Sequence, residues 1–361
     1  MLNNKIIKRN SPIIGVLLMS ALSQLTHAET GNYFMHKDWE LACDNTGMCR
    51  AVGYQSDAQF GHPVSLLISR PAGASSAVLS QIQVAEEFTQ DTEASLNVGG
   101  TSLGSLTIDA KKSTAKLSSA QSAQLLKALV GAEDIRLTTQ AQQWQISTAG
   151  ANAVLLKMDD IQKRVNTPNA VYQKGNQSEQ NVLQPKAIPK IGITGYRPAV
   201  ASHFAVDSKN AHQLFKKLKA TTDEQDCPNL YEVRFFEDDR VSVYPLNAEQ
   251  VVVQVPCWRG AYNEGLGYWV MDKALQKIQQ QVTTSGSSFS EAQIFSEQKG
   301  RGIADCGIRS EWAWNGKAFV LSYQAQSQQC KGFSGGAWNL PTYSPHAKKP
   351  IQYRYELSNT F

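Results

Sequence analysis

The pattern with the most specific chemistry is Gly332–Gly336 (GFSGG), which matches the G-x-S-x-G sequence of serine hydrolases. In those enzymes a strand runs into a sharp turn that exposes the serine, and a helix follows directly. Here a cysteine stands shortly before the pattern, and residues 337–341 after it show no helical pattern. We therefore interpret the segment as a glycine-rich surface loop and name no catalytic residue. A hydrolase acting through Ser334 stays an alternative function.

Metal binding is the second chemistry that the residues could support. The acidic turn Glu237–Asp239 offers carboxylate oxygens, the ligands that calcium prefers, but the spaced D-x-D-x-D loop is missing. Three adjacent acids between strands are typical of a solvated hairpin turn. The cysteines form no C-x₂-C pair of the kind that binds zinc. The sequence therefore predicts no metal and no cofactor.

Five of the seven tryptophans fall in the last third of the chain, where aromatic rings beside polar side chains could bind a glycan or a peptide. The residues that we predict for such a binding surface are Trp258, Tyr262, Asn263, Arg301 and Asp305. The first three lie in a glycine-flanked loop (WRGAYNEGLGYW), and loops lie on protein surfaces. The alternative is that the tryptophans form the core. It is favoured for Trp312 and Trp314, whose predicted face is uniformly apolar.

The six cysteines all follow residue 28, and an even number in an exported chain indicates disulfides. The pairs that we predict are Cys43–Cys49, Cys227–Cys257 and Cys306–Cys330. The later two rest on a weak internal repeat, in which two cysteines flank a strand, a turn and a strand. In a simple three-strand meander Cys227 and Cys257 would lie too far apart, so this pair requires the strand at Val251 to leave the meander. The other pairings of these four cysteines stay open.

A hairpin is predicted around Asn315-Gly316, the dipeptide that a two-residue type I′ turn prefers. Counting outward from this turn pairs Trp314 with Lys317 and Trp312 with Phe319. The residues that would then share one face are Trp312, Trp314, Phe319, Leu321 and Tyr323.

Strand-like runs segregated from a few helices predict an α+β fold of two disulfide-stapled domains, each a largely antiparallel sheet with a few packed helices. The predicted strands are Val64–Ser69, Leu79–Val84, Leu103–Ile108, Trp144–Ser147, Tyr231–Phe236, Val241–Tyr244, Val251–Val255 and Tyr268–Met271, the last leading toward a short helix. Because Ser and Asp cap helix starts and Gly ends helices, the predicted helices run from Ser118 or Ser119 to Gly131, over Ala151–Val165, and onward from Asp207 or Ser208.

The first 28 residues have the form of a secretory signal peptide. Lys5, Lys8 and Arg9 precede an apolar run, Ile13–Leu22, and the segment ends in the small Ala28. The run is too short to span a bilayer, and residue 29 is Glu rather than the Cys that a lipid anchor requires. We expect cleavage near Ala28, a periplasmic location, no membrane span and no lipid anchor.

Charge and length bound the partners and the domains. The full chain has 35 Lys and Arg against 31 Asp and Glu, and 32 against 31 remain without the three basic residues of 1–28. A nearly neutral chain without a basic stripe excludes nucleic acid as a partner. Residues 173–199 begin with a Gln-, Asn- and Pro-containing stretch without apolar periodicity, so we predict a linker there between domains 29–172 and 200–361.

Several segments resemble known families. Trp39–Cys43 with Cys49, Trp144–Ser147 and Met158–Asp160 are similar to invasion-associated locus B proteins of the periplasm. Val255–Asn263 and Gly302–Cys306, with Trp312, Trp314 and Cys330, resemble a bacterial periplasmic family of unknown function, DUF1176. The resemblance implies export and disulfides, and it brings no catalytic residues.

These observations favour an exported, non-enzymatic protein that binds another periplasmic protein or a cell-wall component. An inhibitor or immunity-type protein that blocks a secreted hydrolase is the second hypothesis. The enzyme that would use Ser334 is the third.

Overall fold

The structure is a computed structural model that describes residues 31–131, 134–197, 199–232 and 239–344. The predicted signal peptide (1–28), Glu237 and Asp238 of the acidic turn, and most of the predicted strand Tyr231–Phe236 lie outside these residues. The described part is built mainly from four sheets whose neighbouring strands all pair antiparallel, with few helices. The expectation of largely antiparallel sheets with a few helices is confirmed, whereas the division into two domains stays a prediction.

Residues 31–172, the first half, form two sheets and two helices. The first sheet has the order β1 (Asn32–His36), β2 (Trp39–Cys43), β3 (Cys49–Tyr54), β4 (Val64–Arg70), β5 (Leu79–Val84) and β8 (Thr114–Lys116). The second sheet has the order β10 (Gln143–Ile146), β9 (Ile135–Thr138), β6 (Thr92–Val98) and β7 (Thr101–Ile108). The two helices are α1 (Ser119–Val130) and α2 (Ala151–Ile161), and a short 3-10 helix, η1, covers Asp57–Gln59.

Residues 200–344, the second half, form the other two sheets. The third sheet has the order β11 (Ser202–Ala205), β12 (Arg240–Pro245), β13 (Gln250–Arg259), β14 (Glu264–Asp272) and β15 (Ile278–Gly286). The fourth has the order β16 (Ser288–Ser290), β17 (Gln293–Lys299), β18 (Gly307–Trp314), β19 (Phe319–Ser327) and β20 (Pro341–Tyr343). Helix α3 (Lys209–Leu218) and the 3-10 helices η2 (Glu179–Asn181) and η3 (Pro228–Leu230) complete the elements.

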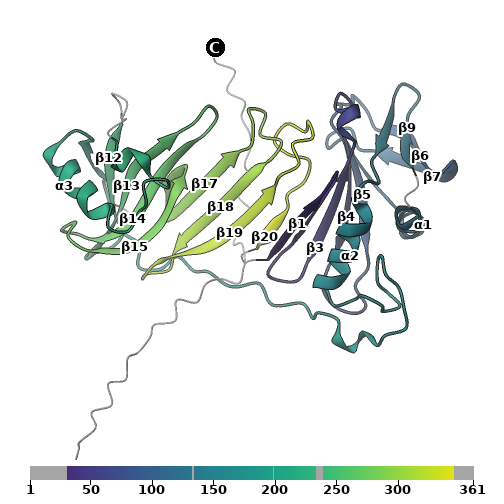
Figure 1. Cartoon of the computed structure of the whole chain (residues 1–361), viewed down its shortest axis with the longest axis horizontal. Coiled ribbons are helices and arrows are strands. Elements are labelled where there is room, and N and C mark those ends of the chain that lie inside the picture. Colours follow the sequence, from purple (N-terminus) through teal and green to yellow (C-terminus); the bar gives the residue numbers. More distant parts are fainter. Residues whose placement is uncertain (1–30, 132–133, 198, 233–238, 345–361) are drawn as a thin grey trace, which may run out of the picture.

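The sheets are stacked in layers, from α3 and the third sheet through the fourth and first sheets to α1, α2 and the second sheet (Figure 1). The central strands of the first sheet, β2, β3 and β4, are buried on both faces. In β2, Trp39, Leu41 and Cys43 pack into the core shared with α1, α2 and the second sheet. Ala42 faces the other way, into a cluster that includes Phe333 and Leu340 of the second half. Because each side of the strand has an apolar neighbour, all five residues of β2 are buried.

The third sheet is covered on both faces in the same way. Val251, Val253 and Val255 of β13 pack with residues of α3, whereas the intervening Val252 packs with Trp314 of the fourth sheet. Side chains alternate between the faces of a strand, so a run of valines supplies both cores at once. This explains why β13 reads as a continuous β-branched run.

Local signals located most elements correctly. The predicted strands in the first half correspond to β4, β5, β7 and β10, and those at Val241 and Val251 to β12 and β13. Ser118 and Ser208 cap α1 and α3 by accepting backbone N–H bonds, and Gly131 follows the end of α1. Helix α2 starts at Ala151 as predicted but ends at Ile161. No helix follows β14, because residues 273–275 form a turn into β15.

The hairpin between β18 and β19 differs from the predicted type I′ turn. Trp314 pairs with Phe319, so the loop holds the four residues 315–318, closed by a 3.1 Å bond from Asn315 N–H to the carbonyl of Ala318. The Asn315 side chain accepts the N–H groups of residues 317 and 318, and Gly316 alone of the four has a positive φ, 96°. The predicted type I′ turn requires a positive φ at Asn315. In the observed loop Asn315 does not have one, and its side chain stabilises the turn through these two hydrogen bonds.

A bulge also divides the predicted aromatic face. Trp312 pairs with Leu321 but Glu311 pairs with Tyr323, so one extra residue lies between them on β19. The extra residue turns Tyr323 to the face opposite Trp312, where its hydroxyl bonds the side chain of Asn339 at 2.5 Å. The expectation that Tyr323 shares a face with Trp312 and Trp314 is wrong.

The structure contains three disulfides, the same pairs that the sequence predicts. Their Cα–Cα distances are 4.0 Å for Cys43–Cys49, 4.3 Å for Cys227–Cys257 and 4.8 Å for Cys306–Cys330. The geometric objection to the second pair disappears because Cys227 lies outside the sheet, at the start of η3, which packs on β13. No helix among the described residues is long and apolar enough to cross a bilayer.

The segment predicted as a linker, 173–199, contacts both halves. Near its start, the Leu183 carbonyl accepts the N–H of Gly73, and the N–H of Lys186 bonds the carbonyl of Thr46 at 3.1 Å. Near its end, the Thr194 hydroxyl donates to the carbonyl of Asn315 at 2.7 Å. Its described residues contain no strand and only the short 3-10 helix η2, and they are bonded to both halves.

Loop length predicts how much each disulfide stabilises the chain. Cys227–Cys257 closes a sequence separation of 30 residues and Cys43–Cys49 one of 6. Replacing both cysteines of a pair by alanine should lower the free energy of unfolding by about 3.5 kcal/mol for the longer loop and about 2 kcal/mol for the shorter one. Urea denaturation followed by tryptophan fluorescence measures both losses against the oxidised wild type. A larger loss for the shorter loop would contradict this account.

Candidate functional site

Three connecting segments meet at one edge of the sheets. They are the β13–β14 turn (260–263), the β17–β18 loop (300–306) and the β3–β4 connection (55–63), which contains η1. The Arg301 guanidinium lies 5.0 Å from the ring centroid of Phe60. A Cβ placed on Gly302 would lie 3.3 Å from the ring of Tyr262. The 301–303 segment therefore lies between aromatic rings from both halves of the chain.

Asp305 is buried and holds this region together. Its carboxylate accepts from Arg301 Nε at 2.7 Å, from a second guanidinium nitrogen, and from the N–H of Gly332 at 2.7 Å. Burial alone would raise the pKa of Asp305, but these donors hold it below its ordinary value. Arg301 also donates to the carbonyl of Cys330 at 3.2 Å. The predicted binding pair Arg301 and Asp305 thus anchors its own loop to the segment after the Cys306–Cys330 disulfide.

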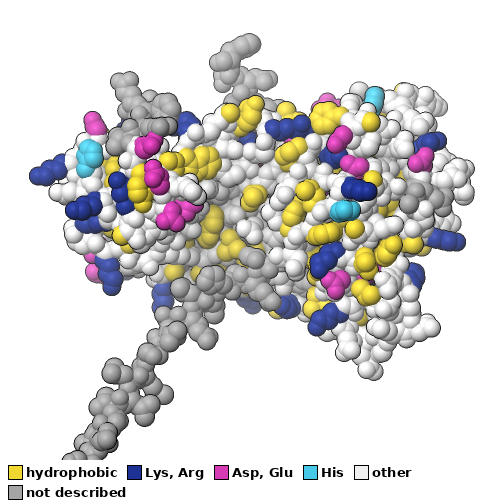
Figure 2. Space-filling model, in the orientation of Figure 1, with side chains coloured by type: hydrophobic (Ala, Val, Ile, Leu, Met, Phe, Trp, Pro, Cys, Tyr) yellow, Lys and Arg dark blue, Asp and Glu magenta, His cyan; other side chains and the backbone are white. Residues whose placement is uncertain are grey.

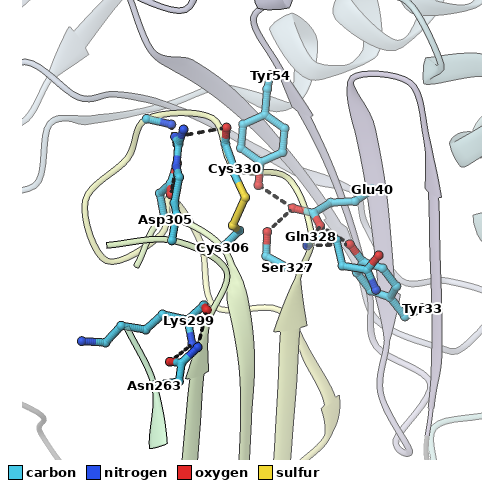
Figure 3. The surroundings of a disulfide bond; sticks show 12 residues. Tyr33, Glu40, Tyr54, Asn263, Lys299, Asp305, Cys306, Ser327, Gln328 and Cys330 are labelled. Carbon is cyan, nitrogen blue, oxygen red and sulfur yellow. Dashed lines mark hydrogen bonds and ion pairs between the residues drawn. A yellow bond between two sulfur atoms is a disulfide. The ribbon is translucent and has the colours of Figure 1, made fainter. Parts of the chain in front are cut away.

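Asn263 is also engaged within the protein. Its amide nitrogen donates to the carbonyl of Lys299 at 2.8 Å, and its amide oxygen accepts the N–H of Lys299 at 2.8 Å (Figure 3). The side chain pairs with the backbone of β17 as a neighbouring strand would. Asn263 therefore joins the third sheet to the fourth.

Trp258 does not offer an exposed ring. It is half-buried and packs against the apolar cluster of α3 and β13. It pairs with Gly265 on β14, where a Cβ would lie 2.1 Å from the indole nitrogen. Because glycine has no side chain, the indole ring of Trp258 can lie directly on the backbone of β14 at Gly265. Of the five predicted residues, Tyr262, Asn263, Arg301 and Asp305 gather around the β17–β18 loop, and Trp258 belongs to the core edge.

Three large apolar side chains stay exposed around this loop, beside exposed charged residues such as Lys299 and Asp57. Tyr262 is 61% exposed, Ile303 48% and Phe60 43%. We call these three residues the loop patch. Apolar and basic side chains along this edge are visible in Figure 2, above the fourth and first sheets. Sequence reasoning missed Phe60 and Ile303, although each is a lone large apolar residue within a polar, glycine-containing stretch (DAQFGH and GRGIAD).

A buried carboxylate, Glu40 of β2, lies where the two halves meet (Figure 3). It accepts from the hydroxyls of Tyr33 at 2.5 Å, Tyr54 at 2.6 Å and Ser327 at 2.7 Å, and from the N–H of Gln328 at 3.2 Å. Burial raises the pKa of Glu40, and the four donors oppose this rise. The site can hold a charge, but no accessible surface reaches it, so its role is structural.

Lys331 forms a second polar bridge between the halves. Its ammonium group lies 2.7 Å from carboxylate oxygens of both Asp38 and Asp57, and its carbonyl accepts from Gln55 at 2.8 Å. Burial alone would lower the pKa of Lys331, but the two carboxylates raise it. The segment after Cys330 is therefore attached to the first sheet by charge as well as by apolar contact.

The structure does not place Ser334 in a catalytic setting. The residue is exposed in a loop, and β20 follows without an intervening helix. Among the residues that the structure describes, none forms a hydrogen bond with the Ser334 hydroxyl. A serine–histidine contact does occur between Ser242 and His203, 2.9 Å apart, but they are cross-strand neighbours and Ser242 is buried. These observations support the loop interpretation of Gly332–Gly336.

Possible metal ligands come together at one place in the described chain, where Asp305 lies beside Cys306 and Cys330. The two sulfurs are bonded to each other and are not thiolates, so they are poor ligands. The Asp305 carboxylate is already occupied by Arg301 and Gly332. In the acidic turn, Asp239 forms an ion pair with Arg259 at 3.4 Å.

The fold and these contacts define a class of protein, one of stacked antiparallel sheets stapled by disulfides, with apolar side chains exposed on its connecting loops. A family model described as a protein of unknown function, DUF1176, matches residues 33–345, and the chain belongs to this family. The uncharacterized protein YpfG of Escherichia coli strain K12 is 24% identical over 337 residues, which cover 83% of this chain and 90% of that protein. No solved structure matches the chain.

Replacing Glu40 tests the junction of the halves. Glu40→Gln puts an amide donor among groups that already donate, so the free energy of unfolding should fall by about 1–3 kcal/mol at neutral pH. Because the pKa of Glu40 is raised above 4.5, the folded protein binds more protons than the unfolded chain between 4.5 and the raised value. Wild-type stability therefore gains from Glu40 protonation as the pH falls through this window, and the variant lacks that gain.

Urea denaturation between about pH 8 and pH 5 measures both effects. The difference in free energy of unfolding should move further in favour of the wild type as the pH falls. The exposed Glu249→Gln is the control, and its difference from the wild type should vary much less. Parallel pH profiles for the wild type and Glu40→Gln would show that the carboxylate is not buried as described.

Proposed function

We propose that this protein is an exported, non-enzymatic binding protein of the cell envelope, and that it contacts a protein partner through the loop patch. The proposal rests on the exposure of Phe60, Tyr262 and Ile303, which come from separate parts of the chain. Hydrogen bonds to Asp305 and the Cys306–Cys330 disulfide hold their loops in place. Ordered apolar side chains on rigid loops favour association, because little conformational entropy is lost on binding.

A protein partner fits this surface better than a glycan. Sugars are recognised by stacking on aromatic rings together with hydrogen bonds to their hydroxyls. The amide of Asn263 and the carboxylate of Asp305 are engaged within the protein, and Ile303 offers no ring. The large apolar side chains left exposed, with charged residues such as Lys299 beside them, resemble the apolar centre and polar rim of a protein–protein interface. An inhibitor of a secreted hydrolase would use the same patch, with an enzyme as the partner.

Export itself is part of the proposal. Three disulfides and the basic and apolar pattern of the first 28 residues support a periplasmic location with cleavage near Ala28. We also infer domains at 29–172 and 200–361 joined by 173–199. We further infer that the first domain is similar to invasion-associated locus B proteins, on the segments Trp39–Cys43, Trp144–Ser147 and Met158–Asp160 together with Cys49.

Site-specific crosslinking tests the loop patch. A photoreactive phenylalanine analogue replaces Tyr262 in cells that export the protein, and in parallel it replaces Leu79, which is 57% exposed on β5. We expect a discrete protein adduct from position 262 that is absent from position 79. Adding Ile303→Asp should reduce the adduct about tenfold, because a charge then enters an apolar contact.

Ile308→Asp is the matched control, since Ile308 is 44% exposed and lies outside the loop patch. It should leave the adduct unchanged. An adduct of equal yield at positions 262 and 79, or one insensitive to Ile303→Asp, would rule out the loop patch as the binding surface. Cleaved, oxidised protein in the periplasmic fraction is expected throughout, and its absence would contradict export.

A further inference from the structure

A groove of about 890 Å³ lies on the first half, away from the loop patch. Its walls are α1, the β4–β5 connection (70–78) and the segment 169–174 after α2. Helices α1 and α2 lie beside each other against the first and second sheets (Figure 1). The volume falls within the ~300–1,000 Å³ of sites that bind small molecules.

The lining of the groove is largely apolar. Val78, Leu126, Val130 and Tyr172 contribute the larger side chains, and alanines and serines of both walls fill the spaces between them. Val130 is 40% exposed at the end of α1, where its side chain adds apolar surface to the groove. The small residues leave an elongated surface that a flexible hydrocarbon chain can follow.

All charged residues of the lining are basic. They are Arg70, Lys127 and Lys174, and no acidic residue lines the groove. Arg70 is 4% exposed and donates to the carbonyls of Ser76 at 3.3 Å and Asn169 at 2.6 Å. Within the described chain no carboxylate lies at ion-pair distance from its guanidinium. Burial and the neighbouring Arg164 lower the pKa of Arg70 to about 10, against the opposing effect of Asp159 and Glu179, so it stays charged at neutral pH.

The residues behind the groove hold Arg70 in place, and the charges of Asp159 and Glu179 partly offset its charge without contacting it. Arg164 is buried and donates to the carbonyls of Gly73 and Ala74, which positions the 70–78 wall. Asp159 accepts the N–H groups of residues 171–173, and Glu179 binds Asn169. Both acids face the backbone that they organise and do not line the groove.

We propose that this groove binds a single-chain anionic amphiphile of the long-chain fatty acid class. The hydrocarbon chain lies along Val78, Leu126 and Val130, and the carboxylate lies near Arg70 and Lys127. A positive charge kept at an apolar groove, with no acid in the lining, complements a ligand with one anionic end and one apolar chain. The proposal is independent of the loop patch, with which the groove shares no residue.

Palmitate binding to the full mature protein tests this proposal. Displacement of a dansyl-labelled undecanoate is followed by fluorescence, with hexadecanol as the neutral counterpart. We expect palmitate to displace the probe and hexadecanol to displace it much less well. Val130→Glu should weaken palmitate binding about tenfold, because it removes apolar contact and adds a like charge. Lys127→Gln should weaken it about threefold.

Matched controls lie outside the groove. Ile308→Glu replaces another exposed branched apolar residue and Lys116→Gln another exposed lysine, and binding by both variants should equal that of the wild type. No displacement by palmitate, equal displacement by hexadecanol, or insensitivity to Val130→Glu would each overturn the proposal. A dimer that Val130→Glu separates would also overturn it, since a second copy would then occupy the groove. Loss of the Tyr262 crosslink bears on the loop patch alone.

Discussion

A carboxylate withdrawn from water is tolerated in a folded protein only when donors surround it, and Glu40 meets this condition with groups from two distant parts of the chain. Tyr33 and Tyr54 come from the first sheet, whereas Ser327 ends β19 of the fourth sheet and Gln328 follows it. Separating the halves would leave the carboxylate without two of its four donors. The second face of the first sheet is therefore an interior surface, although the strands that cover it lie almost 300 residues away along the chain.

The position of the loops follows from this junction. Since the end of β19 is held at Glu40, the segment after it reaches the first sheet, where Lys331 meets Asp38 and Asp57. The Cys306–Cys330 disulfide and the Asp305 contacts then bring the β17–β18 loop to Phe60. Asn263, Arg301 and Asp305 hold the loops through hydrogen bonds, whereas Phe60, Tyr262 and Ile303 stay exposed. The same contacts thus explain both the rigidity and the composition of the loop patch.

The two surfaces differ in chemistry for a structural reason. The loop patch consists of three exposed apolar side chains from both halves, which suits contact with a protein partner. The groove lies between α1 and the β4–β5 connection within the first half, and it combines apolar walls with buried arginine. Each surface can be disabled without disturbing the junction at Glu40.

The sequence by itself determined the features that depend on residues close together in the chain. Ser118 and Ser208 cap helices, the valine run forms β13, and the cysteines pair within their own units, because these outcomes depend on local hydrogen bonds, side-chain alternation and short loops. Only the tertiary structure decided that Trp258 packs on Gly265 and that a bulge turns Tyr323 away from Trp312. It also decided that Phe60 meets Arg301. The burial of a side chain and the register of a strand depend on the residues that the fold brings into contact with them. Those partners lie too far apart in the sequence for a local pattern to predict them.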